Sequence, residues 1–221
     1  LEFRRVLFRS SLKINKPKFV DDFEDIEDFY DEVVLSDKIM NKIVDSEIIE
    51  GKEEKGMNID SCIFRNVVFD NCIFKNIDII DTVFENCDLS NIDFGNGSIE
   101  RVEFINCKLL GAKFDECMMK DVLLKDCLGK YSNFSFSKLN KVHINRCNFE
   151  EGVFQEVSIN KIMFDNTNLL NGVFYNTSLK NVDLTTCEIA GISVGLKDIK
   201  GAKVTAIQGL ELTRLLEIII E

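Results

Sequence analysis

Residues 102–117 read VEFINCKLLGAKFDEC. Within this stretch, large apolar side chains recur at every fifth position, at Phe104, Leu109 and Phe114. A half-buried strand would repeat every second residue and an amphipathic helix every ~3.6 residues, so a period of five fits neither. A small side chain stands two positions before each large one, as Cys107 does before Leu109. The stretch therefore predicts a chain that turns a corner every five residues.

The five-residue repeat runs from Ile59 to Val204 without an insertion, and a large apolar residue occupies 29 of its 30 central positions. Gly129 is the exception, and we expect a local distortion there. A longer period lies within the first, because every fourth central residue forms a column. The column from Phe74 to Phe174 is all Phe, whereas the Ile59 column contains none. Closure after ~20 residues predicts an all-β fold, a quadrilateral parallel β-helix.

The interior of such a coil is narrow, so one large and one small residue from each side would fill it without overpacking. Side chains of one column would stack at the strand spacing of ~4.8 Å, and about 7.5 coils would make a rod about 36 Å long. The expected structural core contains Phe64, Phe74, Phe84, Phe94, Phe104, Phe114, Phe134, Phe154, Phe164 and Phe174.

The first ten residues, LEFRRVLFRS, read as the in-frame translation of a common sequencing-adapter oligonucleotide, and we expect residues 1–10 to be foreign to the natural protein. The chain has a formal net charge of -11, and without these ten residues, which hold three Arg and one Glu, it has -13. Such acidity disfavours direct nucleic-acid binding and favours basic partners.

No apolar run reaches the ~18 residues of a membrane span. We expect a cytoplasmic protein with no membrane partner.

The eight cysteines all occupy the small position of the repeat, and five of them, from Cys87 to Cys187, share one column. Stacked thiols could suggest a metal wire or a disulfide ladder. Their Cβ atoms, however, would lie ~4.8 Å apart in parallel, beyond the ~3.5 to 4.5 Å of a disulfide. We therefore expect reduced thiols that pack as small apolar side chains, with no metal site.

Both ends of the repeat differ from it in composition. In the acidic residues 11–56, FVDDFEDIEDFYDEVV from Phe19 has apolar residues at helical spacing, and SDKIMNKIV from Ser36 indicates a second helix. We expect this segment to cap the coil of residues 57–206, because an open solenoid exposes edges that pair with other chains. Thr205 is placed as a helix N-cap, and residues 207–221 are predicted to form a capping helix and a short strand, Ile218–Ile220.

The sequence contains no catalytic constellation. The one histidine, His143, lies at an outward position, and the repeat brings no nucleophile to it. Carbohydrate-cleaving β-helices carry their chemistry on long loops, but the unbroken repeat leaves no room for loops, and there is no Trp to stack on a sugar. We expect a protein that is not an enzyme, with no catalytic residues and no cofactor.

The charges between the buried positions supply the functional hypothesis. Residues 57–126 hold 13 acids and 7 bases, whereas residues 127–206 hold 7 and 9. A merely solvated acidic surface explains much of this distribution. A sharper hypothesis is mimicry of duplex DNA, since a rod of about 36 Å matches about 10 base pairs and an acidic face could enter a basic DNA-binding groove. The expected contacts are Asp88, Asp93, Asp115, Glu116, Glu150, Glu151 and Glu156.

The repeat resembles the pentapeptide-repeat family, whose members form right-handed quadrilateral β-helices. Residues 100–114, 131–136 and 201–205 resemble the Qnr-type quinolone-resistance proteins of Gram-positive bacteria, although Ala206 stands where those relatives often carry Pro. The resemblance implies that the acidic face binds DNA gyrase or topoisomerase IV and protects the enzyme from quinolones. It also implies a homodimer joined end to end, with an interface of Leu210, Leu212, Leu215, Leu216, Ile218, Ile219 and Ile220.

Two other classes of function stay open. One is an interaction scaffold with a different partner, such as a toxin-immunity or membrane-associated factor, which would use the acidic N-terminal segment as its contact. The other is a solenoid enzyme, which would require a cluster of His, Asp or Cys in a pocket.

Overall fold

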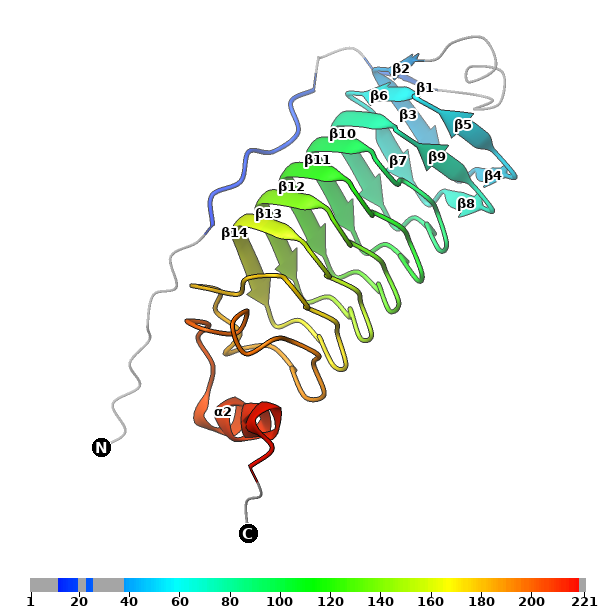
Figure 1. Ribbon diagram of the computed structural model, residues 1–221. Helices are drawn as coiled ribbons and strands as arrows, with labels where there is room; N and C mark the ends of the chain where they lie inside the picture. Colours follow the sequence, from blue (N-terminus) through cyan, green and yellow to red (C-terminus); the bar gives the residue numbers. More distant parts are fainter. Residues whose placement is uncertain (1–11, 20–22, 26–37, 219–221) are drawn as a thin grey trace.

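The computed structural model describes residues 12–19, 23–25 and 38–218. Within these residues the repeat winds into a rod of stacked coils, with a short helix at its C-terminal end (Figure 1). Neighbouring coils pair in parallel with an offset of 20 residues, as Ile79 does with Ile99. The predicted all-β, parallel β-helix with a 20-residue coil is therefore confirmed.

Two adjacent sides of every coil are strands as far as β14. They are separate strands in the first two coils and a single bent strand of eight residues in the five that follow. The separate strands are β2 (Lys38–Met40), β3 (Lys42–Asp45), β6 (Asn58–Asp60) and β7 (Ile63–Arg65). The bent strands are β10 (Asp78–Glu85), β11 (Ser98–Ile105), β12 (Met118–Lys125), β13 (Lys138–Asn145) and β14 (Ser158–Asp165).

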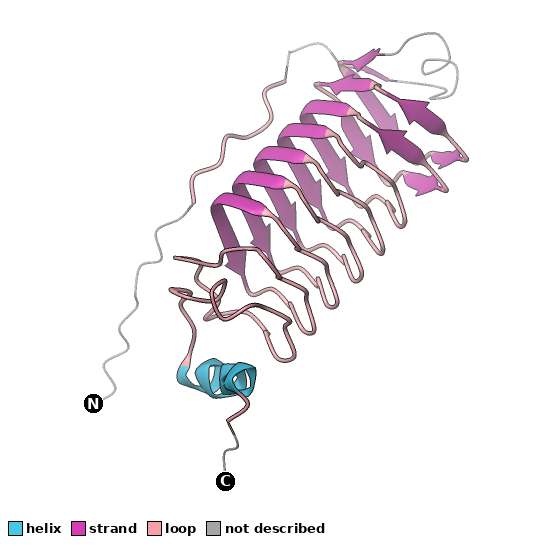
Figure 2. Cartoon of the chain, viewed as in Figure 1, coloured by secondary structure: helices cyan, strands magenta, loops and turns pink. Residues whose placement is uncertain are grey.

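The other two sides change character along the rod. In the first coils they are strands, namely β4 (Ile48–Glu50), β5 (Glu53–Lys55), β8 (Val68–Asp70) and β9 (Ile73–Lys75). From Asp88 onward they are turns that touch the next coil through single bridging residues (Figure 2). Asp88 Oδ1 accepts the Ser90 N–H at 3.1 Å, and Asp93 Oδ1 accepts the Gly95 N–H at 3.0 Å. Such local hydrogen bonds favour turns over strands.

The corners of the coil explain the abundance of asparagine. One residue in nearly every unit has a positive φ, between 46° and 67° for the non-glycine residues of the coil. Asn tolerates this left-handed conformation better than most residues do. Stacked corner residues also bond to one another, since Asn106 Nδ2 donates to Asn86 Oδ1 at 2.8 Å and Asn86 Nδ2 donates to Asn66 Oδ1 at 3.4 Å.

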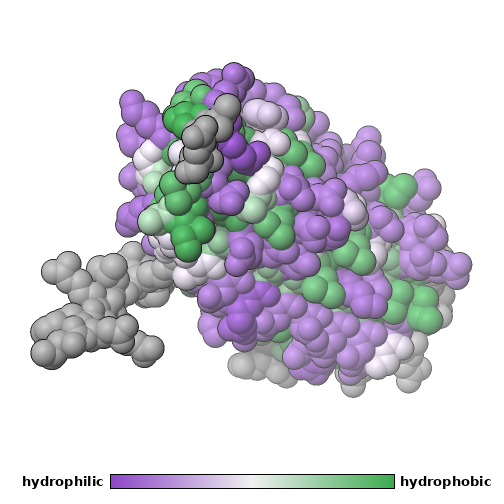
Figure 3. Space-filling view, turned by 90° about the horizontal axis from the view of Figure 1, so that it is seen from below, coloured by the Kyte–Doolittle hydropathy of each residue, from purple (hydrophilic) through white to green (hydrophobic). Residues whose placement is uncertain are grey.

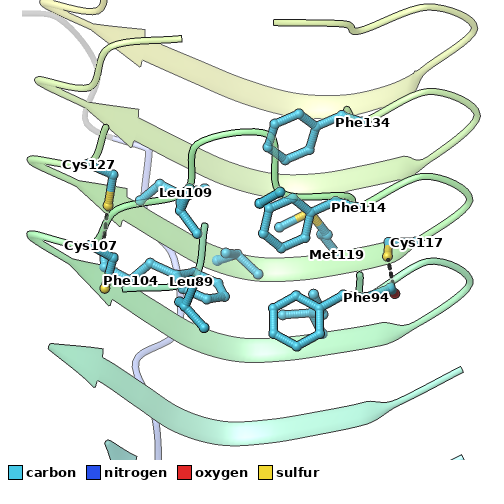
Figure 4. Packing of buried hydrophobic residues seen from close by; sticks show 14 of the residues in the cluster. Leu89, Phe94, Phe104, Cys107, Leu109, Phe114, Cys117, Met119, Cys127 and Phe134 are labelled. Atoms are coloured by element: carbon cyan, nitrogen blue, oxygen red, sulfur yellow. Dashed lines mark hydrogen bonds between the residues drawn. The ribbon is translucent and has the colours of Figure 1, made fainter. Parts of the chain in front are cut away.

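The core fills the interior of the coil, and all ten predicted phenylalanines are buried in it. Figure 4 shows Phe94, Phe104, Phe114 and Phe134 among them. Phe84 and Phe104 stack with ring centroids 5.0 Å apart and planes at 5°, and Phe114 and Phe134 stack at 5.0 Å and 10°. These separations match the ~4.8 Å rise between paired strands. The Phe columns predicted from the sequence therefore form ring stacks, although Leu124 and Ile144 interrupt the column of Phe84.

The predicted distortion at Gly129 is wrong. Its N–H donates to the carbonyl of Asn148 at 2.7 Å, in the same pattern as the neighbouring coils. A Cβ at this position would lie 2.2 Å from Cε1 of Phe149, which is the next residue of the same column. Gly129 therefore leaves room for the ring of Phe149, and the coil continues through it unchanged.

The predicted start of the coil at residue 57 and the predicted helix from Ser36 are also wrong. Residues 38–55 form β2 to β5, which pair with β6 to β9 and add a coil at the N-terminal end. The repeat was obscured there because Glu54 occupies a central position and Lys52 a small one; their charged groups lie 3.8 Å apart. The predicted helix from Phe19 falls mostly outside the described residues, but Glu24–Asp25 form a strand, β1, that pairs with β3.

The C-terminal helix begins where the sequence predicts. In α2 (Ala206–Leu212), the Thr205 side chain accepts the Gln208 N–H, and Gln208 Oε1 accepts the Thr205 N–H. Gln208 Nε2 also donates to the carbonyls of Leu184 and Cys187, which ties the helix to the last coils. A 3-10 turn, η1 (Thr213–Leu216), follows. The predicted strand Ile218–Ile220 lies mostly outside the described residues.

Residues 12–19 form an extended strap along the outside of the rod, beside β10 to β14 (Figure 1). The backbone N–H of Asn15 donates to Asp121 Oδ1 at 3.0 Å, and that of Lys18 donates to Asp81 Oδ1 at 2.8 Å. Three residues of the strap thus span two coils, as an extended chain of ~3.3 Å per residue would. The strap lies on the corner between the two strand sides and leaves the turn sides open.

Candidate functional site

The two turn sides carry the seven acidic residues predicted to contact a partner. On the first turn side, Asp88 lies 3.0 Å from Lys108 Nζ in the next coil. Burial opposes its ionisation, but hydrogen bonds from Ser90 and Lys108 hold the pKa of Asp88 below its ordinary value. This carboxylate is largely neutralised by its lysine neighbour, so its pull on a basic partner is weak.

Asp93 is the member of the predicted set that the structure removes from the surface. It is only 5% exposed, and its Oδ1 accepts the N–H of Gly95 in the turn. Its Oδ2 lies 3.4 Å from Lys75 Nζ and 3.5 Å from Lys113 Nζ. Asp93 therefore stabilises its turn and holds the lysines of the two adjacent coils, which corrects its assignment as a contact residue.

Glu150 and Glu151 share one cation. Lys130 Nζ lies 3.0 Å from Glu150 and 3.3 Å from Glu151, and it also lies 4.9 Å from the ring centre of Tyr131. The hydrogen bond to Glu150 raises the pKa of Lys130, so the lysine stays charged. This corner keeps a net charge of about one negative unit.

Three predicted contact residues keep unneutralised carboxylates. Asp115, Glu116 and Glu156 have no ion pair within the described part of the chain. They follow Phe114 and Phe154 on the same side of the rod, two coils or ~10 Å apart. Glu116 and Glu156 are exposed corner residues with φ of 57° and 55°. They form the open acidic patch of the rod.

The cysteine column is a buried structural ladder. All eight thiols are free and buried. Sγ of Cys107 donates to the carbonyl of Phe84 at 3.3 Å, and Sγ of Cys127 to that of Phe104 at 3.4 Å (Figure 4). Burial raises the pKa of Cys62 to about 11 and that of Cys117 to about 12. Cys62 and Cys117 are thus held in the neutral form, which suits packing rather than metal binding or nucleophilic chemistry.

His143, the one histidine, points outward from β13 and lies 3.0 Å from Asp165 Oδ2, in the neighbouring coil. The two residues are 22 positions apart in the sequence, and the 20-residue length of the coil brings them side by side.

Among the described residues, no group of three His, Cys, Asp or Glu is arranged to hold a metal ion. Likewise, no helix among them is long and apolar enough to cross a bilayer.

The C-terminal cap divides the predicted dimer residues into two groups. Leu212 and Leu215 pack against the core of the coil, whereas Leu210 and Leu216 are 58% and 56% exposed. Ile218 is also exposed, and Ile219 and Ile220 lie outside the described residues. Viewed from the C-terminal end, apolar side chains alternate with polar ones on the surface (Figure 3).

Two protein-family models match the sequence. The model described as the SV2A/B/C luminal domain matches residues 22–114, and the model described as the pentapeptide repeat region matches residues 97–146. The second match covers β11, β12 and β13.

The coil is a pentapeptide-repeat β-helix.

Similar solved structures include QnrB1, described as a plasmid-mediated fluoroquinolone resistance protein. A trypsin-treated form is 20% identical over 83% of this chain and 94% of that chain, with a TM-score of 0.49. Full-length QnrB1 is 20% identical over 82% and 100%, with a TM-score of 0.37. HetL, a pentapeptide repeat protein from the cyanobacterium Nostoc involved in heterocyst differentiation regulation, is 10% identical over 75% and 86%, with a TM-score of 0.35. No curated protein matches the sequence.

The pentapeptide-repeat coil carries a second polar feature that sequence reasoning missed. Under the strap, one corner column alternates in charge: Arg101 lies 2.6 Å from Asp81, and Lys141 lies 3.7 Å from Asp121. The 20-residue spacing predicts the column itself. It does not predict the hydrogen bonds from Asn15 to Asp121, because Asn15 lies outside the repeat.

Proposed function

We propose that this pentapeptide-repeat protein is a binding protein, not an enzyme, and that its open acidic patch occupies the basic DNA-binding groove of a type II topoisomerase. Asp115, Glu116 and Glu156 are the contact residues in this proposal, with Glu150 and Glu151 beside them. Occupancy of the groove by the rod would protect DNA gyrase or topoisomerase IV from quinolones.

The observation that carries the proposal is the arrangement of the patch. Within the described residues no loop covers the turn sides of the rod, so a partner groove can approach them along the coil. Asp115, Glu116 and Glu156 lie on one side with no ion pair among the described residues. An acidic row on a rigid rod attracts a groove built for phosphates. The resemblance of the repeat to Qnr-type proteins supports the choice of enzyme.

We further propose that two rods join through their C-terminal caps in the cytoplasm. Leu212 and Leu215 pack against the core and hold the cap on the coil. Leu210 and Leu216 are exposed, so the cap has an apolar surface at the end of the rod. Exposed apolar side chains at one end of a rod favour end-to-end association. The reduced thiols of the core fit a reducing compartment.

Purified protein without residues 1–10 tests the proposal in assays of gyrase supercoiling and of quinolone-stabilised DNA cleavage. We expect inhibition of quinolone-stabilised cleavage and salt-sensitive binding to the enzyme. The variant Glu116→Lys with Glu156→Lys should lose both. Asp78→Lys with Glu103→Lys is the matched control, because it also reverses two carboxylate charges, but on the strand sides. Lack of protection by the unaltered protein, or equal loss in the control, would refute the proposal.

A further inference from the structure

Strand β14 is the last strand of the large parallel sheet, with β13 on one side. In earlier coils the chain bonds to the preceding coil along these two sides, as Ser158 N–H does to the carbonyl of Ser137 at 2.9 Å. Residues 178–185, which hold the equivalent place in the next coil, form none of these backbone bonds to β14 within the described part of the chain. Their bonds run onward instead, from Leu179 N–H to Asp198 O and from Leu184 N–H to Lys203 O.

This separation opens a groove of about 1370 Å³ between β14 and residues 178–185, with Leu12 and Lys13 of the strap at its edge. Its volume exceeds the ~300 to 1,000 Å³ of most small-molecule pockets. Ile159 and Ile162 of β14, which pack against the core, are only partly buried here, unlike their equivalents in earlier coils. The groove thus presents apolar side chains and, along residues 158–164, backbone groups that have no ladder partner in the described residues of the next coil.

The groove is also basic in an otherwise acidic protein. Five lysines line it, and Asp183 is the one acid among its lining residues. Lys141 has Asp121 as a partner at 3.7 Å. The other four have no ion pair within the described residues; they are Lys13, Lys161, Lys180 and Lys203.

We propose that this groove binds an extended acidic segment of a partner protein, which adds to β14 as a further strand. An extended peptide supplies both N–H and C=O groups along its length, as the open edge of β14 requires. Side chains alternate between the two faces of a strand. Apolar residues of the segment would therefore cover Ile159 and Ile162, and carboxylates would reach Lys161 and Lys180.

A peptide fits this groove better than a single-stranded nucleic acid does. A phosphate backbone offers acceptors to the lysines but no donors to the backbone carbonyls of a strand edge. Sites for single strands also stack the bases on exposed aromatic rings, and the one aromatic residue lining this groove, Phe164, is buried. The net charge of -11 repels nucleic acid from the rest of the rod.

The test uses the full chain and a fluorescein-labelled peptide of eight residues, the length of β14, that alternates Asp with Val. Fluorescence anisotropy should show saturable binding. Lys161→Glu and Lys180→Glu should each weaken it about fivefold or more. Lys200→Glu is the matched control, since Lys200 is an exposed lysine near the same end that does not line the groove. Amide hydrogen exchange should slow in residues 158–165 when the peptide is bound.

Two further ligands separate strand addition from simple charge attraction. A peptide of the same sequence with alternate amides N-methylated should bind at least about tenfold more weakly, because it cannot complete the ladder of hydrogen bonds. A single-stranded oligothymidylate should not displace the acidic peptide. No binding of the acidic peptide, equal binding of the methylated one, displacement by the oligonucleotide, or unchanged exchange in β14 would each overturn the proposal.

Discussion

Asn15 donates two hydrogen bonds to the carboxylate of Asp121, one from its backbone N–H to Oδ1 and one from Nδ2 to Oδ2, each 3.0 Å long. The two residues are 106 positions apart in the sequence. Asp121 is buried, and Lys18 of the same strap donates to Asp81 two coils away. The strap is therefore fastened to two carboxylates of one corner column.

Loss of this anchor should release the strap. Asp121→Ala removes both acceptors for Asn15 and the partner of Lys141, and hydrogen bonds to a charged group contribute about 1.5 to 3 kcal/mol. We expect a lower free energy of unfolding in urea and faster tryptic cleavage after Lys18. Asp126→Ala is the control, because its partner Arg146 is exposed and such a pair contributes at most about 1 kcal/mol. Equal cleavage rates in the two variants would contradict the role of Asp121.

Acid should weaken the other anchor of the strap. Burial of Asp81 opposes its ionisation, but hydrogen bonds from Arg101 and from the Lys18 N–H outweigh it and hold the pKa of Asp81 below its ordinary value of 3.8. A pKa lowered on folding gives stability that is present above the unfolded pKa and is lost as pH falls through the folded pKa. The free-energy difference between the protein and Asp81→Asn should therefore shrink below about pH 4. Urea titrations from pH 7 to pH 3 measure it; a constant difference would exclude this linkage.

Gly129→Ala should destabilise the coil through overpacking. The added Cβ would lie 2.2 Å from Cε1 of Phe149, and overpacking a close-packed core costs about 1 to 3 kcal/mol. Phe149→Leu in the same chain should recover part of the loss, which a double-mutant cycle in urea would detect. Gly209→Ala in α2 should be neutral or stabilising, because nothing lies within 4 Å of its added Cβ. Additive effects at residues 129 and 149 would argue against the contact.

The thiols should be inert in the native protein. All eight are buried, and burial raises the pKa of Cys62 and Cys117 to about 11 and about 12. Because the thiolate is the reactive form, Ellman's reagent at pH 8 should detect eight thiols only after denaturation. Ser178→Cys, which places a thiol at an exposed position, should react at once with one equivalent. Rapid reaction of the unaltered protein would show that the ladder is open to solvent.

The end-to-end dimer should depend on the exposed residues of the cap. Leu210→Asp with Leu216→Asp places two charges on apolar surface that is 58% and 56% exposed, and we expect light scattering to give half the mass of the unaltered protein. Leu110→Asp, on a turn side and 40% exposed, should keep the dimer mass. The dimer is refuted if the unaltered protein is a monomer, and this interface is refuted if the double variant keeps its mass.

Periodicity made the coil predictable, and interruptions of periodicity mark where prediction failed. The columns of Phe84 and Phe114 follow from the spacing of five and the offset of 20, because each unit buries the same two positions. The repeat does not predict the first coil, because Lys52 and Glu54 stand where the pattern requires a small and a large apolar residue. Gly129 was misread as a defect because the ring that fills its space, that of Phe149, belongs to the next coil.

The candidate surfaces depended more on the tertiary structure. Charge and phase placed Asp93 and Glu116 on the same turn side in neighbouring coils, but only the structure shows that Asp93 is buried between two lysines while Glu116 is exposed. Whether a carboxylate is free depends on the residues 20 positions before and after it and on how their side chains reach it. Those distances are set by the coil and cannot be read from composition.

By itself, the sequence determined the coil, its 20-residue period, its Phe columns and the N-cap at Thr205, because these depend on local preference and on a pattern repeated in every unit. Only the tertiary structure decided that residues 12–19 strap the rod, that Asp121 receives Asn15, and that β14 parts from residues 178–185. The five-residue repeat does not predict these features, because they depend on how segments far apart in the sequence lie in the folded rod.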